Sequence, residues 1–196
     1  MALDLSALRR IIADENRLLT GADIPAEYQS DVLGRVHGSA EALAFPLSTE
    51  EVSALLRYAH EHRVPVTPRG AGTNLVGSTV PLEGGIILDL SRMDRVLELD
   101  EDTMTVTVEP GMQGYVEARG LFYPPDPGEK ASSIGGNIST NAGGMRAVKY
   151  GVTRDYVRGL EVVLADGTVM QVGGKQVKDA SGLSLKHLLI GSEGTL

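Results

Sequence analysis

The chain has 196 residues, of which 42% are hydrophobic, and its 26 acidic and 18 basic residues give a net charge of −8. The acidic balance argues against nucleic acid as the main partner, because phosphate-binding surfaces need a basic excess, and the hydrophobic content is too high for a disordered chain. Cysteine is absent, which excludes disulfides, thiolate metal sites, iron–sulfur ligation within this chain and a cysteine nucleophile.

Two features of the composition set expectations for the whole chain. Glycine contributes 24 residues, of which only three lie before residue 67, against an average of roughly 7% of a chain.

The first twelve residues are charged and contain no long apolar run, so they do not resemble a signal peptide. No stretch approaches the roughly 18 apolar residues that a membrane helix needs. We therefore expect a cytoplasmic protein without a transmembrane segment, which a partner could hold at a membrane surface.

The first third of the chain predicts an α/β start. A short helix is expected over 5–13, an irregular segment over 23–38 and a strand over 42–46. Ser48 and Glu51 form a capping box, which opens a helix whose apolar residues follow helical spacing. With a stop at Pro65 and a short strand over 64–67, the pattern predicts a β-α-β unit before the first glycine-rich loop.

The rest of the chain predicts short strands and turns. Strands are expected over 86–90, 95–99, 104–109, 157–164 and 168–172. The last two flank Ala165-Asp166-Gly167, which predicts a hairpin. A short helix is expected over 183–190.

A glycine-rich loop over residues 68–78 follows a predicted strand and reads P-R-G-A-G-T-N-L-V-G-S. Consecutive backbone amides in such a loop can form a concave site for phosphate oxygens. Two better-known motifs fail: after Gly70 and Gly72 the next glycine is Gly77, at the wrong spacing for a dinucleotide fingerprint, and Ser78 stands where a Walker A motif needs lysine. We favour a phosphate-binding loop of another kind, and the alternative is a glycine-rich turn without a ligand.

A second glycine-rich segment, residues 124–144, begins P-P-D-P-G and ends with the run S-S-I-G-G-N-I-S-T-N-A-G-G. Ordered glycine costs roughly 0.5–1 kcal/mol relative to alanine, so such a segment is easiest to explain if its backbone passes close to a large flat ligand. A flexible linker is the alternative, against which Ile134 and Ile138 argue.

Five motifs occur together in one order: P-R-G-A-G-T-N, P-P-D-P-G, I-G-G-N-I-S-T-N-A-G-G, K-Y-G at 149–151 and G-S-E-G-T at 191–195. From about Ala42 onward the chain resembles the FAD-binding domain of the vanillyl-alcohol oxidase and p-cresol methylhydroxylase type, and most of all the glycolate oxidase FAD subunit and D-lactate dehydrogenase group. The resemblance implies an α+β domain of two subdomains that hold FAD between them. It implies a first α/β subdomain over about 40–110 and part of a second over about 111–196.

The resemblance also implies which residues bind FAD. The pyrophosphate is expected against Arg69, Gly70, Ala71, Gly72, Thr73, Asn74, Gly77 and Ser78. The flavin and its ribityl chain are expected against Pro125, Asp126, Ser132, Gly135, Gly136, Asn137, Ser139 and Thr140. Glu193 and Gly194 are expected near the adenosine end, and the flanking Pro68 and Gly143 are included in the FAD-binding set. Some relatives tether FAD through a histidine at the place of Thr73, so non-covalent FAD is expected here.

The chain departs from the family at its end. After G-S-E-G-T-L, relatives continue into a strand that completes the FAD site and into a substrate-binding cap. We therefore expect an incomplete FAD-binding domain without a cap, inactive by itself, and the catalytic residues stay unassigned. Residues 112–119 are also shorter than the helix that relatives have between this Pro-Gly turn and the next glycine.

The four histidines do not suggest a metal site. His60 and His62 lie at the expected exposed end of a helix, and a surface role is favoured over metal binding. His37 and His187 are isolated, and no carboxylate cluster frames them. No metal is expected.

Three cations follow the second glycine-rich segment: Arg146, Lys149 and Arg154. They could face an anionic flavin edge or a substrate carboxylate, where a positive charge stabilises developing negative charge. A solvated loop is an equally good interpretation.

The resemblance implies an FAD-dependent oxidoreductase in which hydride passes from a small 2-hydroxy acid, of the glycolate or D-lactate type, to flavin N5. Electrons would then pass to a separate acceptor, an iron–sulfur subunit or a quinone. One alternative is an FAD-dependent oxidase of another alcohol in the same family. An alternative from a different class is a non-catalytic module that binds a nucleotide or a partner protein.

Overall fold

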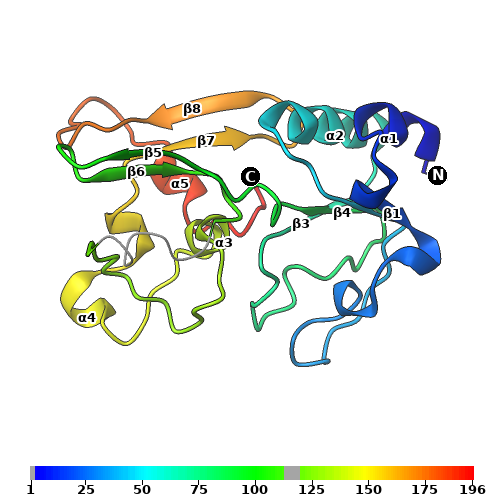
Figure 1. The fold of residues 1–196 in the computed structure, drawn as a ribbon, viewed down its shortest axis with the longest axis horizontal. Helices are drawn as coiled ribbons and strands as arrows, with labels where there is room; N and C mark the ends of the chain where they lie inside the picture. The colour runs from blue at the N-terminus through cyan, green and yellow to red at the C-terminus, as the bar shows by residue number, and fades with distance from the viewer. Residues whose placement is uncertain (1–2, 113–119) are drawn as a thin grey trace. The chain divides into compact units, whose positions relative to one another are not determined.

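The computed structural model describes residues 3–112 and 120–196. The chain divides into two compact units, Met1–Arg92 with Val163–Val169 and Met93–Val162 with Met170–Leu196. Helices and short sheets occur together in the chain (Figure 1), so the expected α+β class is confirmed.

The first unit is built on a four-stranded sheet with the order β1-β2-β4-β3. Its elements are α1 (Leu5–Ile11), β1 (Leu18–Thr20), β2 (Ala42–Ala44), α2 (Thr49–His62), β3 (Val66–Arg69) and β4 (Ile86–Asp89), with single 3-10 turns at Glu15–Arg17, Gly21–Asp23 and Ala26–Tyr28. The strands β2, β4 and β3 run parallel, and β1 is antiparallel to β2. The predicted β-α-β unit is therefore present as β2-α2-β3, but β4 lies between its two strands.

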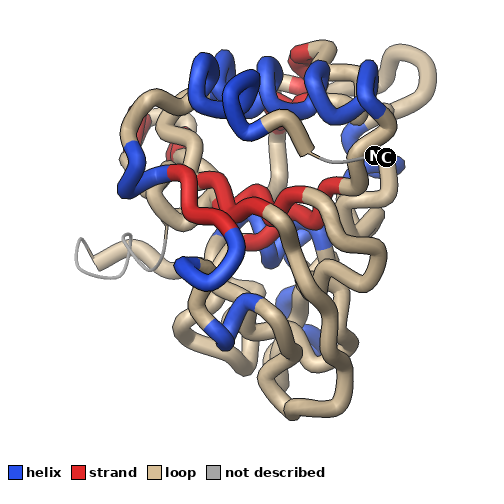
Figure 2. The backbone as a smooth tube through the Cα atoms, turned by 90° about the vertical axis from the view of Figure 1, so that its right-hand side faces the viewer, coloured by secondary structure: helices blue, strands red, loops and turns tan. Residues whose placement is uncertain are grey.

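Both faces of this sheet are covered, as expected for parallel strands. Helices α1 and α2 lie along one side of the strands, and loops with short helical turns lie along the other (Figure 2). On one face, Leu43 and Ile87 belong to a buried cluster with Ile24, Ala40 and Phe45. Side chains alternate along a strand, so the equally buried Ile86 and Leu88 point to the opposite face.

Helix α2 begins at a side-chain cap. The hydroxyl of Ser48 accepts a hydrogen bond of 3.3 Å from the Glu51 amide, as the capping box predicts. The carboxylate of Glu51, however, accepts from the amide of Leu47 at 2.8 Å, one residue before the cap. At the other end, Arg63 adopts a left-handed conformation with φ 53°, so the helix ends at His62, three residues before the predicted stop at Pro65.

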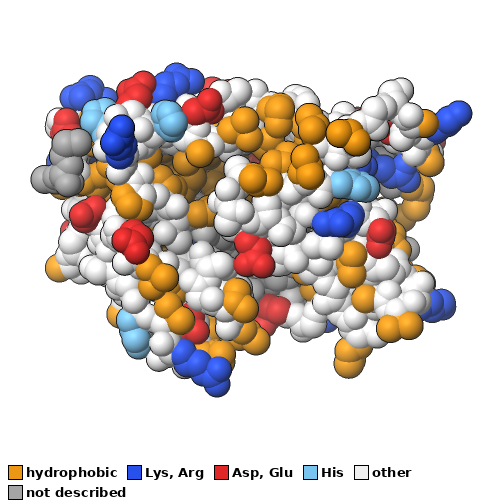
Figure 3. All heavy atoms as spheres, turned by 180° about the vertical axis from the view of Figure 1, so that it is seen from behind, with side chains coloured by type: hydrophobic (Ala, Val, Ile, Leu, Met, Phe, Trp, Pro, Cys, Tyr) orange, Lys and Arg blue, Asp and Glu red, His pale blue; other side chains and the backbone are white. Residues whose placement is uncertain are grey.

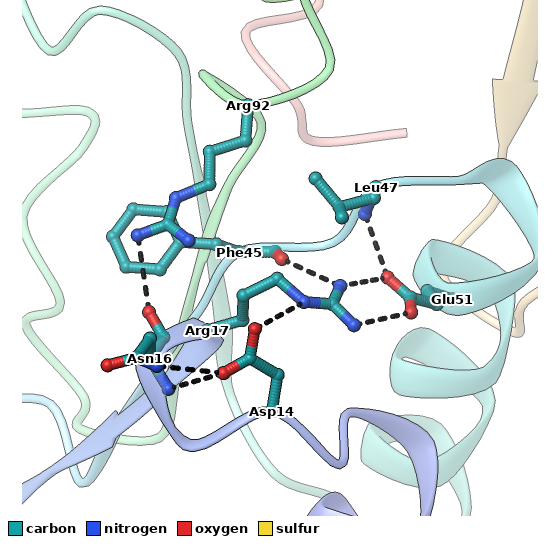
Figure 4. A network of polar contacts seen from close by, with 7 residues as sticks. All are labelled: Asp14, Asn16, Arg17, Phe45, Leu47, Glu51 and Arg92. Carbon is teal, nitrogen blue, oxygen red and sulfur yellow. Dashed lines mark hydrogen bonds and ion pairs between the residues drawn. The ribbon is translucent and has the colours of Figure 1, made fainter.

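A network of polar contacts joins the start of the chain to β2 and α2 (Figure 4). Arg17 donates to both carboxylate oxygens of Glu51, at 2.7 and 3.1 Å, and to the carbonyl of Phe45 at 3.3 Å. The guanidinium of Arg92 lies 4.3 Å from the centre of the Phe45 ring and donates to the carbonyl of Asn16. Two arginines thus hold the irregular N-terminal segment against the sheet.

The second unit consists of two small sheets and short helices. Strands β5 (Val96–Asp100) and β6 (Thr105–Val108) pair antiparallel, and β7 (Gly159–Val163) and β8 (Val169–Gly173) form the second sheet. The helices are α3 (Ile134–Ser139), α4 (Ala147–Tyr150) and α5 (Lys186–Leu189), with a 3-10 turn at Thr153–Asp155.

Three expectations for this unit need correction. Met104 was expected in a half-buried strand, but it lies in a turn with φ 52° and is 70% exposed. The final helix starts at Lys186 instead of residue 183. The run I-G-G-N-I-S, expected to be a ligand-lining loop, forms α3. The short segment over 112–119 lies almost wholly outside the described residues, because 113–119 are not described.

Large hydrophobic side chains remain exposed in the second unit, among them Met145, Val148 and Leu183. Figure 3 shows hydrophobic side chains gathered on the face of the molecule that it displays. No helix in the described parts of the chain is long and apolar enough to cross a membrane.

Candidate cofactor-binding site

The first glycine-rich loop leaves the sheet of the first unit at a position suited to ligand binding. Strands β3 and β4 are parallel and in register, with Arg69 opposite Asp89 at their carboxyl ends. Ligands of open α/β sheets bind outside the carboxyl ends of such strands. The loop predicted to hold a pyrophosphate starts at this edge.

The backbone of this loop has a run of free donors. In residues 3–112 and 120–196, none of the amides from Gly70 to Leu75 donates a hydrogen bond to the protein. The side chain of Asn74 accepts from the amides of Val76 and Ser78, at 3.3 and 3.2 Å, and donates to Thr79 at 3.0 Å. Asn74 therefore shapes the loop from within, and the free amides start on its N-terminal side.

Two glycines of the loop are required by the protein itself. Gly72 has φ +70°, and a Cβ there would lie 2.3 Å from Nη2 of Arg69. Gly77 has φ +75°, and its Cβ would meet the side chain of Val36 at 3.0 Å. Because L side chains rarely adopt such φ values, these glycines need no ligand to explain them.

Arg69 is the cation of this loop, and its surroundings come from segments that the sequence analysis did not select. Its guanidinium lies 4.5 Å from the centre of the Tyr28 ring. The hydroxyl of Tyr28 donates to Oδ2 of Asp89 at 2.9 Å, and Asp89 is 2% exposed. Burial, together with the charge of Asp89 and this hydrogen bond, raises the pKa of Tyr28 far above its usual value, so the hydroxyl stays protonated as a donor.

Tyr28 and Asp89 were missed for different reasons. Tyr28 lies in the irregular segment over 23–38, and nothing in its local sequence indicates a contact with Arg69. Asp89 ends the apolar run I-I-L-D, and an acidic residue at the end of a buried strand was a signal that could have been used.

In the second unit, α3 carries four of the predicted FAD-binding residues: Gly135, Gly136, Asn137 and Ser139. Ser133 caps it by accepting from the Gly136 amide at 3.2 Å. The amides of Ile134 and Gly135 donate to the carbonyls of Met112 and Pro110. The backbone amides in the first turn of α3 therefore already donate to atoms of the protein. A ligand would contact other atoms of α3.

The structure brings the G-S-E-G segment to the other end of α3. The amides of Gly191 and Glu193 donate to the carbonyls of Ile138 and Ser139, at 3.0 and 2.9 Å. Glu193 adopts a left-handed conformation with φ 55°. Residues predicted to contact the flavin and the adenosine thus lie side by side in one unit, although more than 50 positions separate Ser139 from Glu193 in the sequence.

The remaining predicted residues of this unit lie in the loops around α3. Pro125 is buried, and Asp126 has φ 40° and forms ion pairs with Lys130 and Arg146. The hydrogen bond from Lys130, with the charge of Arg146 added, holds the pKa of Asp126 below its usual value. A Cβ on Gly144 would lie 2.0 Å from the Asp126 carbonyl, so close chain packing explains this glycine. The predicted flavin-lining carboxylate is thus already balanced by cations of the protein.

The three cations that follow α3 take part in contacts within the second unit. Arg146 pairs with Asp126, its Nε lying 3.2 Å from Oδ2, and Lys149 donates to the Tyr150 hydroxyl at 3.0 Å. Arg154 donates to the carbonyl of Ile190 at 3.0 Å, while its Nε is buried without a partner. These contacts give each cation a role in the fold without a substrate. Within the described residues, no group of three or more His, Asp or Glu side chains could hold a metal.

The residues present suit FAD. Within the residues that the structure describes, six amides of the loop donate to no protein atom and Nη1 of Arg69 is buried without a partner. These donors match the two negative charges of a pyrophosphate, because backbone amides in a loop form an anion-binding concavity. In the second unit, the hydroxyls of Ser132 and Thr140 donate to backbone carbonyls, which leaves their lone pairs free to accept hydrogen bonds from a ligand.

The fold and this donor set define a flavin-nucleotide-binding domain. The chain belongs to the FAD binding domain family, whose model matches residues 40–173. This membership confirms the expected family and cofactor. The contact residues listed above remain predictions.

Comparison with known proteins shows which members of the family the chain is similar to. The chain is 50% identical over 190 residues to the glycolate oxidase subunit GlcD of Bacillus subtilis, a match that covers 94% of this chain and 39% of the relative. It is 46% identical over 187 residues to a D-lactate dehydrogenase of Anaerostipes hadrus, covering 92% of this chain and 39% of the relative. Among solved structures, an alkyldihydroxyacetonephosphate synthase superposes with a TM-score of 0.82 at 26% identity, over 100% of this chain and 42% of the other. The chain thus spans about two fifths of the length of the relatives it matches.

Proposed function

We propose that this chain is the FAD-binding portion of an oxidoreductase that oxidises a small 2-hydroxy acid. FAD binding follows from the family. The substrate class is supported by the names of two relatives at 46–50% identity, since glycolate and D-lactate are both small 2-hydroxy acids. The observation in this structure that carries the proposal is the run of free amides from Gly70 to Leu75 beside Arg69.

The chain's own residues bind and orient the cofactor. The free amides and the guanidinium of Arg69 would hold the pyrophosphate, and the atoms of α3 and of the G-S-E-G segment would line the rest of the molecule. Bound FAD supplies the two-electron acceptor for hydride from the substrate's α-carbon. The protein contributes binding, orientation and local charge.

The other parts of the proposal concern the surroundings of the reaction. Electrons would pass from the flavin to a separate acceptor, an iron–sulfur subunit or a quinone. The protein would be cytoplasmic, and a partner could hold it at a membrane surface. FAD would be bound without a covalent bond, because Thr73 stands where some relatives have histidine and the chain has no cysteine.

The purified chain, reconstituted with FAD, tests the proposal. Flavin fluorescence measures binding, and the loss of oxidised flavin absorbance under anaerobic conditions measures reduction by glycolate or D-lactate, with acetate as the control. Bleaching by a hydroxy acid supports the full proposal. Bound flavin that no hydroxy acid reduces is the result expected of an FAD-binding portion that is inactive by itself, and it favours an FAD-binding module. A protein that binds no FAD contradicts the cofactor site.

A further inference from the structure

Tyr28 lies outside every glycine-rich motif, yet it contacts the one cation of the first loop. The centre of its ring is 4.5 Å from the guanidinium carbon of Arg69. A Cβ on Gly72 would lie 2.3 Å from Nη2 of the same guanidinium. The arginine side chain is therefore close to both the Tyr28 ring and a glycine of the loop.

The charge of Arg69 is not neutralised by the protein. Asp89 is its neighbour across the β3–β4 pair, but Oδ2 of Asp89 accepts from the Tyr28 hydroxyl at 2.9 Å and Oδ1 from the Ser91 amide at 2.8 Å. Among the residues that the structure describes, Arg69 forms no ion pair, and its Nη1 is buried without a partner. The positive charge is left available to an anion.

Holding an arginine in this state has a cost that the surroundings must offset. Ordering a long side chain costs rotamer entropy, and a buried donor without a partner adds a further cost. A stack on an aromatic ring recovers part of this cost through the cation–π attraction. The ring is itself fixed, because its hydroxyl is bonded to a carboxylate that is 2% exposed.

We propose that Tyr28 is a positioning residue for the pyrophosphate of the bound dinucleotide: it holds the unpaired guanidinium of Arg69 against the free amides of the first loop before the ligand arrives. The inference rests on the proposed FAD binding. It extends the site to a segment with no glycine motif and assigns Tyr28 a role that acts through Arg69 alone.

A double-mutant cycle tests this role, with Tyr28→Leu, Arg69→Met and the double variant. Their affinities for FAD, ADP and riboflavin are measured by fluorescence and calorimetry, and thermal unfolding without ligand checks that each variant folds. Tyr28→Leu is expected to weaken FAD and ADP about tenfold, within the range of a partly desolvated cation–π contact, and to leave riboflavin, which has no phosphate, unchanged. In the Arg69→Met background, Tyr28→Leu is expected to cause no further loss, because coupled residues are non-additive.

The outcomes distinguish a failure of the positioning role of Tyr28 from a failure of the proposed FAD binding. Unchanged ADP affinity in Tyr28→Leu, equal losses for ADP and riboflavin, or a full second loss in the double variant would each overturn the positioning role while FAD binding stands. A wild-type chain that binds neither FAD nor ADP overturns both proposals. If Tyr28→Leu does not fold, the cycle is run with Tyr28→Phe, which keeps the ring and loses the bond to Asp89. A smaller loss of ADP affinity, about twofold to threefold and absent in the Arg69→Met background, is then the supporting result.

Discussion

Arg17 and Glu51 show how single charged groups hold the N-terminal segment to the first unit. Their side chains are 14% and 23% exposed, so the pair is neither a surface ion pair nor a fully buried one. Burial opposes ionisation of Glu51, but the hydrogen bonds from Arg17 and the Leu47 amide, with the charge of Arg17, outweigh it and lower the pKa of Glu51. Three donors depend on this one carboxylate.

Replacing Glu51 by glutamine is expected to destabilise the chain by about 1–3 kcal/mol, between the values for exposed and buried pairs. The variant removes the nearer charge from the Arg17 guanidinium and leaves the longer contact of its Nε with Asp14, at 3.8 Å. Urea unfolding followed by circular dichroism measures the loss. Glu50→Gln is the matched control, because Glu50 is the exposed neighbour in the same helical turn. Equal losses in both variants would show that the pair with Arg17 contributes nothing specific.

The same carboxylate predicts a pH dependence. A folded pKa below the ordinary glutamate value of about 4.5 means that the unfolded state binds the proton more readily. The stabilisation is therefore complete above about pH 4.5 and is lost as the pH falls through the lower folded pKa. The stability difference between wild type and Glu51→Gln is expected to shrink over that acidic range in urea titrations at stepped pH. A difference that stays constant down to the acid transition would rule out this linkage.

At the scale of elements, helix α3 shows how close packing accounts for glycine. A Cβ on Gly135 would lie 2.7 Å from Cβ of Pro110, which is closer than real Cβ contacts come. A Cβ on Gly136, one residue later, would meet only the Ser133 hydroxyl at 3.1 Å. Packing against Pro110 therefore excludes a side chain at position 135, whereas position 136 has room for one if the Ser133 hydroxyl moves.

Gly135→Ala is expected to destabilise the chain without any ligand by about 1–3 kcal/mol, the usual cost of overpacking, despite the better helix propensity of alanine. Gly136→Ala is the matched control and is expected to cost less, because only a side-chain hydroxyl must move. Thermal unfolding without FAD compares the two. If both variants unfold like the wild type and lose only FAD affinity, approach of a ligand, and not packing on Pro110, is the reason for glycine at 135.

At the scale of the whole molecule, each of the two compact units contains one of the glycine-rich regions that the sequence predicts to bind FAD. A ligand that binds only the folded chain stabilises it by RT ln(1 + [L]/Kd), about 2.7 kcal/mol at one hundred times Kd. The cofactor is therefore expected to contribute to the stability of the chain as well as to its chemistry.

FAD at one hundred times its Kd is expected to raise the unfolding temperature of the chain by several degrees. Riboflavin and ADP, which each carry part of FAD, are expected to raise it less at equal concentration. Differential scanning fluorimetry with an extrinsic dye measures the shifts. An equal shift with ADP alone would indicate that only the nucleotide half contacts the protein.

Denaturation is expected to release all of the flavin, because the proposed binding involves no covalent bond. Acid precipitation of the reconstituted protein, followed by absorbance of the supernatant and the pellet, checks this. Flavin that remains with the pellet after washing would contradict non-covalent binding. It would point to a tether other than cysteine, which the chain lacks.

Much of the fold follows from local pattern. The helix over 49–62, the strands β2, β3 and β4 and the 165–167 turn lie close to the predicted positions, because caps, period-two alternation and glycine turns are set by near neighbours in sequence. Strand β1 was not predicted. The helical state of residues 134–139 does not follow from local pattern, since two glycines argue against a helix. Ser133 supplies a local cap, and the carbonyls of Pro110 and Met112, more than 20 positions earlier in the sequence, accept from the first two amides of the helix.

The amino-acid sequence by itself determined the family, the cofactor and the two glycine-rich regions, because the motifs and their order along the chain can be read directly from it. Only the tertiary structure decided which of those residues have atoms to spare for a ligand. The side chains of Asn74 and Asp126 already have partners within the protein, whereas the amides from Gly70 to Leu75 donate to no atom of the described residues. Tertiary structure alone also placed Tyr28 and Asp89 beside Arg69. The physical reason is that hydrogen bonding and burial depend on contacts between distant segments, and a sequence motif does not record which partners have already been taken.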